Sequence, residues 1–307
     1  MHRGGPPGFR SSGFRLAIFL VFLWAFALAT VAGADDLAEI RQRGTIRHLG
    51  IPYANFVTGS GDGFDVELIR LFAEHLGLRY QYVETDWKRV VGDLSGRTVR
   101  VVGDDVEVTG TAPIRGDLVS NGYTMLPWRE KVVAFSEPTF PTQVWLIARS
   151  DFPMKPIQPS GEIERDIEAV KSVLKGRTLL GVANSCLDPG LYNITAPATR
   201  IRLFEGRLDD VAPAVIKGVA ELALLDLPDS LISMQKWPGK TKVIGPVSPP
   251  QRMATAFRKE SPELRRAFNE FLKLCQRDGT YMRLVRKYYP YAADYSPAFF
   301  RDSMAQR

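Results

Sequence analysis

The chain has 307 residues, 45% of them hydrophobic and 24% charged, which is the ordinary composition of a globular protein. A formal net charge of +6 is a mild excess, and no basic cluster alternates with aromatic residues, so we expect no nucleic-acid partner. The three histidines and two cysteines lack the spacing of a zinc site. Neither a Gly-x-Ser-x-Gly elbow nor a phosphate-binding loop is present, and we expect no cofactor.

The N-terminus has the pattern of a secretory signal peptide. Three arginines precede an apolar run over residues 16–29, and no acidic residue occurs before Asp35. The small residues Ala-Gly-Ala end at Ala34, as a cleavage site requires. An apolar run of about 15 residues is short for a bilayer span, which needs about 20, so an uncleaved anchor is the less favoured alternative. We expect cleavage after Ala34 and a periplasmic protein.

The first segment after the leader predicts a strand, a helix and a second strand. Residues 45–51 favour a strand, and residues 52–63 form a loop rich in glycine and small polar residues. Residues 64–77 place apolar side chains at helical spacing, with Asp65 as a candidate N-cap and a glycine at the end. Residues 78–83 alternate as a strand does. This order predicts parallel pairing through a right-handed crossover.

A β-hairpin and a crossing between lobes are predicted next. Two valine-rich runs over residues 97–110 flank the turn sequence Gly-Asp-Asp, which indicates a hairpin. Residues 117–124 predict another strand that ends in a turn. Residues 132–148 contain two prolines and then an apolar strand, and this segment predicts a passage from one lobe to the other.

The second half repeats the same alternation of helices and strands. Helices are expected over 167–176, 208–218, 263–275 and 281–289, and extended segments over 177–183, 199–204, 219–226, 241–248 and 251–258. Pro262 after Ser261 marks the start of the first C-terminal helix. Alternation of this kind predicts an α/β fold with mainly parallel sheets. We expect lobe 1 to contain residues 35–143 and 252–307, and lobe 2 to contain residues 144–251.

Arg129 and Asp226 stand out as charged residues at the ends of predicted strands. A guanidinium binds a carboxylate through two parallel hydrogen bonds, although a solvated surface arginine is the commoner case. Asp226 could bind an ammonium group or cap the helix that the following Leu-Pro begins. Tyr53 and Trp87, in loops at strand ends, could line a ligand or fill the core.

Several ordered segments resemble the periplasmic solute-binding proteins of family 3, which serve ABC importers of polar amino acids and related solutes. The clearest is "GYTMLPWREKVVAFSEP" at residues 122–138, which is similar to the family's Gly-x-Thr-x-Thr-x-x-Arg and Phe-Ser-x-Pro pattern. Similar segments lie at 45–94, 174–182, 218–228 and 261–289. The resemblance implies a two-lobed periplasmic-binding-protein type II fold. Each lobe would be a mainly parallel sheet flanked by helices, with the ligand cleft between the lobes.

The resemblance also assigns ligand-binding roles to residues at matching positions. Arg129 would grip the ligand carboxylate, and Asp226 would bind the α-ammonium group. Gly122 and Thr124 would hold the polar head of the ligand through the backbone and the hydroxyl. Charge-assisted hydrogen bonds of this kind are about twice as strong as neutral ones.

Two aromatic residues and the turn that opens lobe 2 complete the expected site. Tyr53 falls where an aromatic ring covers the ligand side chain, and Trp87 falls where a second ring lines the pocket. The family's Gly-Thr turn is replaced by Asn184-Ser185-Cys186. We therefore include Ser185 and Cys186 among the expected ligand-binding residues.

The sequence departs from the family pattern at three further places. The second threonine of the motif is Leu126, an acidic residue that often precedes the first aromatic is Gly50, and residues 97–115 resemble an insertion. These departures leave the carboxylate grip in place and the identity of the ligand open. A compact amino acid fits best, and a carboxylic acid without an amine is the alternative.

Three functions follow from the resemblance. The first is a monomeric binding protein whose partners are a small polar solute and a membrane permease. The second is a periplasmic enzyme similar to cyclohexadienyl dehydratases, with Glu84, Asp86 or Asp188 as the general acid. The third is a soluble sensor subunit for a membrane receptor. A fold by itself does not decide among them.

The two cysteines lie in different settings. Cys275 shares a helical face with apolar residues, which favours a buried thiol, and Cys186 lies in a turn. Whether the two form a disulfide stays open, because the sequence does not fix the distance between them.

Overall fold

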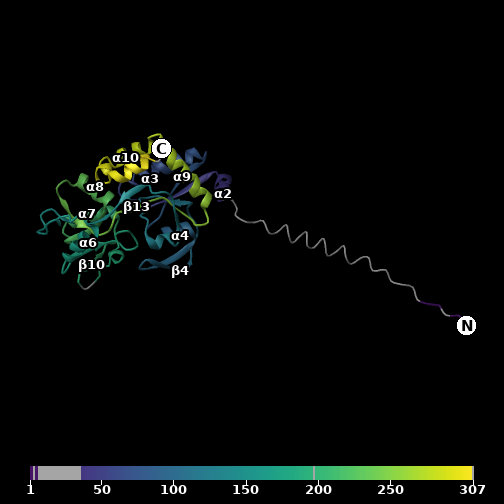
Figure 1. Ribbon diagram of the computed structural model, residues 1–307, viewed down its shortest axis with the longest axis horizontal. Helices are drawn as coiled ribbons and strands as arrows, with labels where there is room; N and C mark the ends of the chain where they lie inside the picture. Colours follow the sequence, from purple (N-terminus) through teal and green to yellow (C-terminus); the bar gives the residue numbers. More distant parts are fainter. Residues whose placement is uncertain (3, 6–35, 196–197, 306–307) are drawn as a thin grey trace.

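The computed structural model has a two-lobed α/β fold (Figure 1) and describes residues 1–2, 4–5, 36–195 and 198–305. Apart from residues 1–2 and 4–5, the predicted signal peptide lies outside the described residues. Within the described part of the chain, no helix has both the length and the apolar character that a bilayer span requires.

Lobe 1 is built on a five-stranded sheet in the order β2–β1–β5–β14–β6. The strands are β1 (Thr45–Gly50), β2 (Arg79–Glu84), β5 (Leu118–Val119), β6 (Ala134–Phe135) and β14 (Ala256–Phe257). β1 pairs in parallel with β2 and β5, whereas β14 runs antiparallel to β5 and β6. Since β14 comes from the far end of the chain, the C-terminal return completes this sheet. The helices of lobe 1 are α2 (Asp36–Arg43), α3 (Phe64–His75), α4 (Val90–Ser95), α5 (Pro127–Glu130), α9 (Pro262–Arg277) and α10 (Thr280–Tyr288).

Lobe 2 repeats this arrangement with the order β10–β9–β11–β8–β12. The strands are β8 (Val144–Arg149), β9 (Thr178–Gly181), β10 (Arg200–Leu203), β11 (Leu222–Asp226) and β12 (Thr241–Pro246). β9, β10 and β11 are parallel, and β8 is antiparallel to both β11 and β12. The helical segments are α6 (Ile163–Ser172), η1 (Pro189–Tyr192), η2 (Leu208–Asp210), α7 (Val211–Ile216) and α8 (Leu227–Lys236). Each sheet is thus mainly parallel, as predicted, and each also contains one antiparallel strand, β14 in lobe 1 and β8 in lobe 2.

Two short strands connect the lobes. β7 (Phe140–Thr142) and β13 (Gln251–Met253) pair antiparallel in a separate two-stranded sheet. They lie where the sequence predicts the two crossings, although the boundaries at 143 and 252 stay predictions. The C-terminal helices α11 (Ala292–Tyr295) and α12 (Pro297–Ala305), which the sequence analysis missed, follow α10. Phe300 is buried, with its ring 5.8 Å from that of Phe140, so this segment packs on the connecting strands.

The predicted hairpin is confirmed, and one predicted strand is shorter than expected. β3 (Arg97–Val102) and β4 (Asp105–Thr111) pair antiparallel around a turn in which Gly103 has a φ of 60°. The strand expected over residues 117–124 contains only Leu118–Val119. Gly122, at a φ of 63°, turns the chain away from the sheet.

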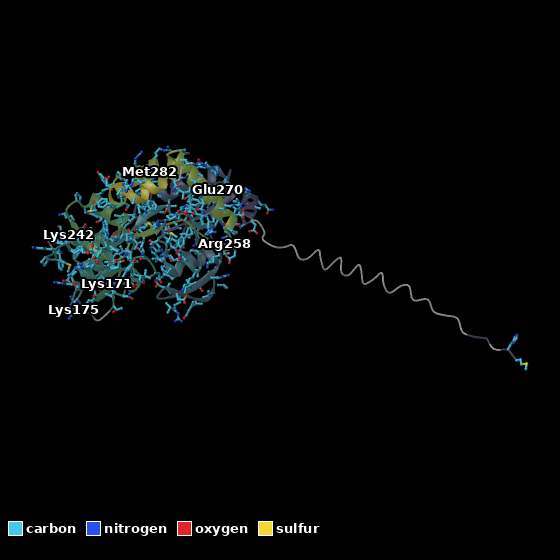
Figure 2. All side chains as sticks on the ribbon, viewed as in Figure 1. Lys171, Lys175, Lys242, Arg258, Glu270 and Met282 are labelled. Atoms are coloured by element: carbon cyan, nitrogen blue, oxygen red, sulfur yellow. The ribbon has the colours of Figure 1, made fainter. Side chains whose placement is uncertain are left out.

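Alternation along the strands of lobe 1 explains how its sheet is covered on both faces. Ile46 and Leu118 are buried in the core that α3 and α9 share, whereas Leu49 and Val119 are buried in a second cluster with α4. Side chains fill the space between the ribbons (Figure 2), where the labelled Lys171, Lys175 and Lys242 lie on lobe 2, Arg258 on lobe 1, and Glu270 and Met282 on the helices α9 and α10.

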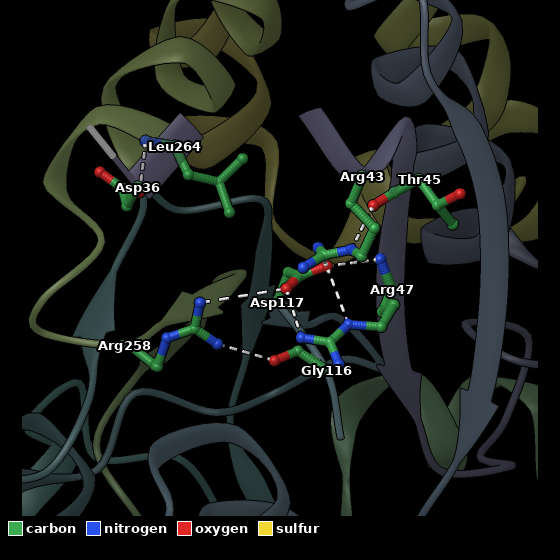
Figure 3. A network of polar contacts seen from close by, with 8 residues as sticks. All are labelled: Asp36, Arg43, Thr45, Arg47, Gly116, Asp117, Arg258 and Leu264. Carbon is green, nitrogen blue, oxygen red and sulfur yellow. Dashed lines mark hydrogen bonds and ion pairs between the residues drawn. The ribbon is translucent and has the colours of Figure 1, made fainter. Parts of the chain in front are cut away.

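A buried carboxylate ties the start of lobe 1 to its C-terminal return (Figure 3). Asp117 is fully buried and pairs with Arg43 at 2.6 Å and with Arg47 at 2.8 Å. Arg258, next to β14, approaches the same carboxylate at 3.9 Å and donates a hydrogen bond of 2.8 Å to the Gly116 carbonyl. Two guanidinium groups from the start of lobe 1 and one from its C-terminal return therefore converge on one buried carboxylate.

We predict that Asp117→Ala lowers the free energy of unfolding by about 2–4 kcal/mol, because three guanidinium groups lose their common partner. Urea unfolding measures the change. The control is Glu107→Ala, which removes an exposed pair with Arg100 and should cost less than about 1 kcal/mol. Equal losses in both variants would show that the Asp117 cluster does not stabilise the fold.

Candidate functional site

Arg129 is a buried residue on a short helix and not a surface arginine at a strand end. It lies on α5, which begins at Pro127, and its exposed fraction is 0%. Nη1 donates a hydrogen bond to the Thr124 carbonyl at 2.9 Å, and Nη2 donates a longer one, 3.4 Å, to the Asn184 carbonyl of lobe 2. Nε is buried and has no hydrogen-bond partner in the structure. The alternative of a solvated arginine is therefore wrong.

Aromatic rings surround the guanidinium of Arg129. Its central carbon lies 4.0 Å from the ring centroid of Tyr123, 5.2 Å from that of Trp128 and 5.5 Å from that of Trp87. Ring faces attract a cation but do not neutralise it. No described carboxylate pairs with this guanidinium, whose hydrogen bonds go to backbone carbonyls only. The site thus holds a buried positive charge that has no counter-ion among the described residues.

Asp226 brings a buried negative charge to the same region from lobe 2. It closes β11 and is the N-cap of α8, where Oδ1 accepts a hydrogen bond from the Asp229 backbone at 3.1 Å. Oδ1 also accepts a hydrogen bond from the Tyr53 hydroxyl of lobe 1. Burial raises the pKa of Asp226 to about 6, although these hydrogen bonds oppose the shift. The predicted helix cap is confirmed, and the role in binding an ammonium group stays a prediction.

Cys186 lies between the two charged residues. Its thiol donates a hydrogen bond to Asp226 Oδ2 at 3.6 Å, and it is close enough to Arg129 for that charge to act on it. Burial raises the pKa of the thiol, which keeps it protonated as a donor. The Thr124 hydroxyl faces this thiol and is fully buried, but it makes no hydrogen bond of standard length and angle. Thr124 thus contacts Arg129 through its carbonyl and Cys186 contacts Asp226, and their roles in ligand binding stay predictions.

The backbone N–H of Gly122 has a partner within the protein. It donates a hydrogen bond of 2.6 Å to Oδ2 of Asp65. A Cβ at Gly122 would lie 2.5 Å from the ring of Phe56, so this close approach needs glycine. Asp65 is not the N-cap of α3, a position that Gly63 occupies, because its side chain reaches across to Gly122 instead. Burial raises the pKa of Asp65 to about 7.

Ser185 uses its hydroxyl to shape the turn that opens lobe 2. The hydroxyl donates a hydrogen bond to the Val182 carbonyl at 2.8 Å and accepts one from the Leu187 backbone at 3.0 Å. The contact of this turn with Arg129 comes from the carbonyl of Asn184, which has a φ of 61°. Ser185 therefore lies at the site, with its hydroxyl directed to its own turn.

The predicted aromatic residues are joined by rings that the sequence analysis did not select. Tyr53 is buried, and the half-buried Trp87 lies edge-on to it at 6.5 Å between ring centroids. Trp87 also stacks on Tyr123 at 6.3 Å. Tyr123 and Trp128 are inside the 122–138 motif, and their closeness to Arg129 in the sequence could have marked them as part of the site. The buried amide of Asn121, next to Gly122 in the sequence, was not selected either, and both of its polar atoms lack a hydrogen-bond partner among the described residues.

The three acids considered for an enzymatic role have other partners or lie at the surface. Asp86 pairs with Arg89 at 2.7 Å, and hydrogen bonds from Arg89 lower its pKa, although partial burial opposes the shift. Asp188 caps η1 by accepting a hydrogen bond from Gly190 at 2.9 Å. Glu84 is exposed at the end of β2.

The two thiols do not pair with each other, and the possible metal ligands among the described residues do not cluster. Cys186 and Cys275 are both buried and form no disulfide. Among residues 36–195 and 198–305, no three side chains of His, Cys, Asp or Glu gather as a metal site would need.

Residues 108–291 match the sequence profile of the bacterial extracellular solute-binding proteins, family 3. The chain belongs to this family. One family 3 relative is the arginine-binding extracellular protein ArtP of Bacillus subtilis, which is 23% identical over 86% of this chain and 93% of its own length. The membrane-bound lytic murein transglycosylase F of Desulfosudis oleivorans is 24% identical over 89% of this chain. The chain covers only 56% of that enzyme's length.

A solved structure shares the fold of this family 3 protein. A mutant of ArgBP from T. maritima has a TM-score of 0.66 and 22% identity, over 83% of this chain and 99% of its own. At this identity the likeness shows the two-lobed fold alone, and the ligand must be argued from the site.

The raised pKa of Asp65 predicts a pH-dependent contribution to stability. The folded state holds the proton to about pH 7, whereas an unfolded aspartate releases it near pH 4. The stability that Asp65 provides is therefore full below about pH 4 and is lost as the pH rises to about 7. Asp65→Asn stays neutral and keeps an acceptor for the Gly122 N–H. As the pH rises from about 4 to about 7, the free energy of unfolding of the variant should increase relative to that of the wild type by roughly 2–4 kcal/mol.

Urea unfolding of both proteins across this pH range measures the difference. Asp104→Asn, which changes an exposed carboxylate of the hairpin, is the control. If the difference in free energy of unfolding between Asp65→Asn and the wild type does not change with pH, the buried carboxyl does not titrate in this range.

Proposed function

We propose that this protein binds a small zwitterion, an α-amino acid or a closely related carboxylate, between its two lobes. One observation carries the proposal: a buried guanidinium on lobe 1 and a buried carboxylate on lobe 2 both contact the 184–186 turn, and neither forms an ion pair with a described residue. Arg129 would bind the ligand carboxylate, and Asp226 would bind the ammonium group.

The free-energy cost of burying unpaired ions favours a solute that carries one positive and one negative charge. An ion without a partner in a protein interior costs several kcal/mol, and this penalty is about the same whether the ion is an anion or a cation. A zwitterion supplies both missing counter-charges at once, whereas a sugar supplies neither. Nε of Arg129 has no partner and Nη2 has one long bond, and two adjacent nitrogens of this kind bind a carboxylate as a fork.

The surrounding side chains support a compact solute. Tyr53, Trp87 and Tyr123 provide aromatic walls, and the hydroxyl of Thr124 has no partner of its own. Next to Gly50, where related proteins often have an acid, the ring of Tyr82 would lie 2.5 Å from a Cβ. The position is thus filled by a phenol ring, which argues against recognition of a ligand cation there.

Transport is the role that family membership supports best. The proposed sequence of events is export through the leader, cleavage after Ala34, capture of the solute in the periplasm, and delivery by a monomer to an ABC-type permease. ArtP, which this chain matches along most of its length, is named an arginine-binding extracellular protein.

Arg129→Gln should weaken binding of an α-amino acid by at least about thirtyfold, because truncation of a buried charged contact costs 2 kcal/mol or more. A thermal-shift panel of the standard L-α-amino acids, small carboxylates, amines and sugars identifies the solute, since binding to the folded state raises the melting temperature. Calorimetric titration then compares the variant with the control Arg266→Gln, an exposed residue of α9. Unchanged affinity in a folded Arg129→Gln protein would refute the assignment.

Asp226→Asn should weaken α-amino acids at least about tenfold more than carboxylates that lack the amine. The amide keeps an acceptor for the Asp229 backbone and the Tyr53 hydroxyl, but it no longer offers a negative charge to an ammonium group. Competition titrations with matched pairs, such as alanine and propionate, measure the ratio. Equal losses for both classes would mean that Asp226 does not bind the ammonium group.

A further inference from the structure

The loop that carries Tyr53 is fixed firmly to lobe 1. The Tyr53 N–H donates a hydrogen bond to the Val57 carbonyl at 3.0 Å. The Asn55 backbone donates one to the Tyr289 hydroxyl at 3.0 Å, and the Asn55 amide donates one to the Tyr288 carbonyl at 2.8 Å. The loop is therefore held by the C-terminal end of α10 as well as by its own turn, and it moves as part of lobe 1.

The opposite side of this loop binds lobe 2 at two points. The Ala54 N–H donates a hydrogen bond of 2.7 Å to Oδ1 of Asp209, and the Tyr53 hydroxyl donates one to Asp226. Asp226 belongs to the proposed ligand site, whereas Asp209 lies outside it, on the 3-10 turn η2 that precedes α7. Asp209 thus joins the lobes without belonging to the set of residues that would contact the solute.

The backbone of the loop is in an unusual conformation at this contact. Ala54 has a φ of 46°, which is in the left-handed region that alanine rarely adopts. This conformation presents its N–H to lobe 2, where Oδ1 of Asp209 accepts the hydrogen bond. Ala54 is only 5% exposed, so its N–H needs this partner when the lobes are together.

Asp209 can accept the Ala54 hydrogen bond when the lobes are in contact and can be hydrated when they are apart. Its side chain is 24% exposed, and its second oxygen lies 3.5 Å from Arg207 of the same turn. Separation of the lobes would leave the carboxylate with water and Arg207, at little cost. The Ala54 bond, in contrast, exists only while the two lobes touch.

We propose that Asp209 is a closure latch, a positioning residue that holds the Tyr53 loop against lobe 2 and so slows release of the bound solute. The proposal rests on the function proposed above. It adds a residue that would control affinity through the equilibrium between open and closed lobes, without contact with the solute. Its loss should act mainly on the dissociation rate, because the bond forms after the solute has entered.

The test compares Asp209→Leu with Asp210→Leu. Asp210 is the next residue of the same turn, is exposed, and makes no capping hydrogen bond. The probe is the standard L-α-amino acid with the largest thermal shift, and stopped-flow fluorescence gives both rate constants. We expect Asp209→Leu to raise the dissociation rate and Kd about tenfold, and Asp210→Leu to change them less than about twofold.

A second variant and a second measurement keep the test decisive. Asp209→Asn retains an oxygen acceptor and should raise Kd only about threefold, which covers the case in which the leucine variant does not fold. X-ray scattering of the protein without added solute should give a larger radius of gyration for Asp209→Leu than for Asp210→Leu. Equal radii and equal Kd values in the two leucine variants would overturn the latch.

The outcomes also separate the latch from the proposed function. If Arg129→Gln loses binding while Asp209→Leu binds as tightly as Asp210→Leu, only the latch fails. If no solute in the panel binds, the proposed function fails, and the scattering comparison alone decides whether Asp209 holds the lobes together. If Asp209→Leu lowers the melting temperature but leaves Kd unchanged, Asp209 supports the fold and is not a latch.

Discussion

The guanidinium of Arg129 is buried, and none of the described residues provides a counter-ion for it. A guanidinium does not give up its proton in a protein, so its charge must be compensated by its surroundings. Here two backbone carbonyls and three aromatic rings supply partial compensation, and none of them carries a charge. Such a group is costly to bury, and a site that retains it gains strong binding when an anion arrives. The aromatic rings around the guanidinium exclude water from it and limit the size of a solute that could bind there.

The two-lobed fold supplies this site by bringing the ends of parallel strands together. Tyr53 follows β1 and Thr124 follows β5 in lobe 1, while Cys186 follows β9 and Asp226 closes β11 in lobe 2. In open α/β sheets, ligands bind beyond the carboxyl ends of the strands. Because the two charges belong to different lobes, contact between the lobes determines whether both can act on one molecule. The hydrogen bonds from Tyr53 and Ala54 to lobe 2 therefore help to keep Arg129 and Asp226 in one site.

A layer of buried polar groups beneath the site fixes its shape. Asp65 holds the backbone of Gly122, and the packing of Phe56 against that glycine leaves no space for a side chain. The N–H of Gly122 is therefore used within the protein, and a role of its backbone in holding the solute stays a prediction. The carboxyl of Asp65 instead supports the chain that carries Thr124 and leads to Arg129.

Local sequence patterns were enough to predict the order of elements, the hairpin, the start of α9 at Pro262 and the choice of Arg129 and Asp226 as candidates. Periodicity and turn residues report how each short segment is buried, and these features follow from them. Four features could be seen only in the folded chain: Arg129 is buried, Asp65 binds Gly122, the Ser185 hydroxyl bonds within its own turn, and the C-terminal segment packs on the connecting strands. Asp65 and Gly122 are 57 residues apart and Tyr53 and Asp226 are 173 apart. No local pattern encodes such partners, because packing of distant elements chooses them.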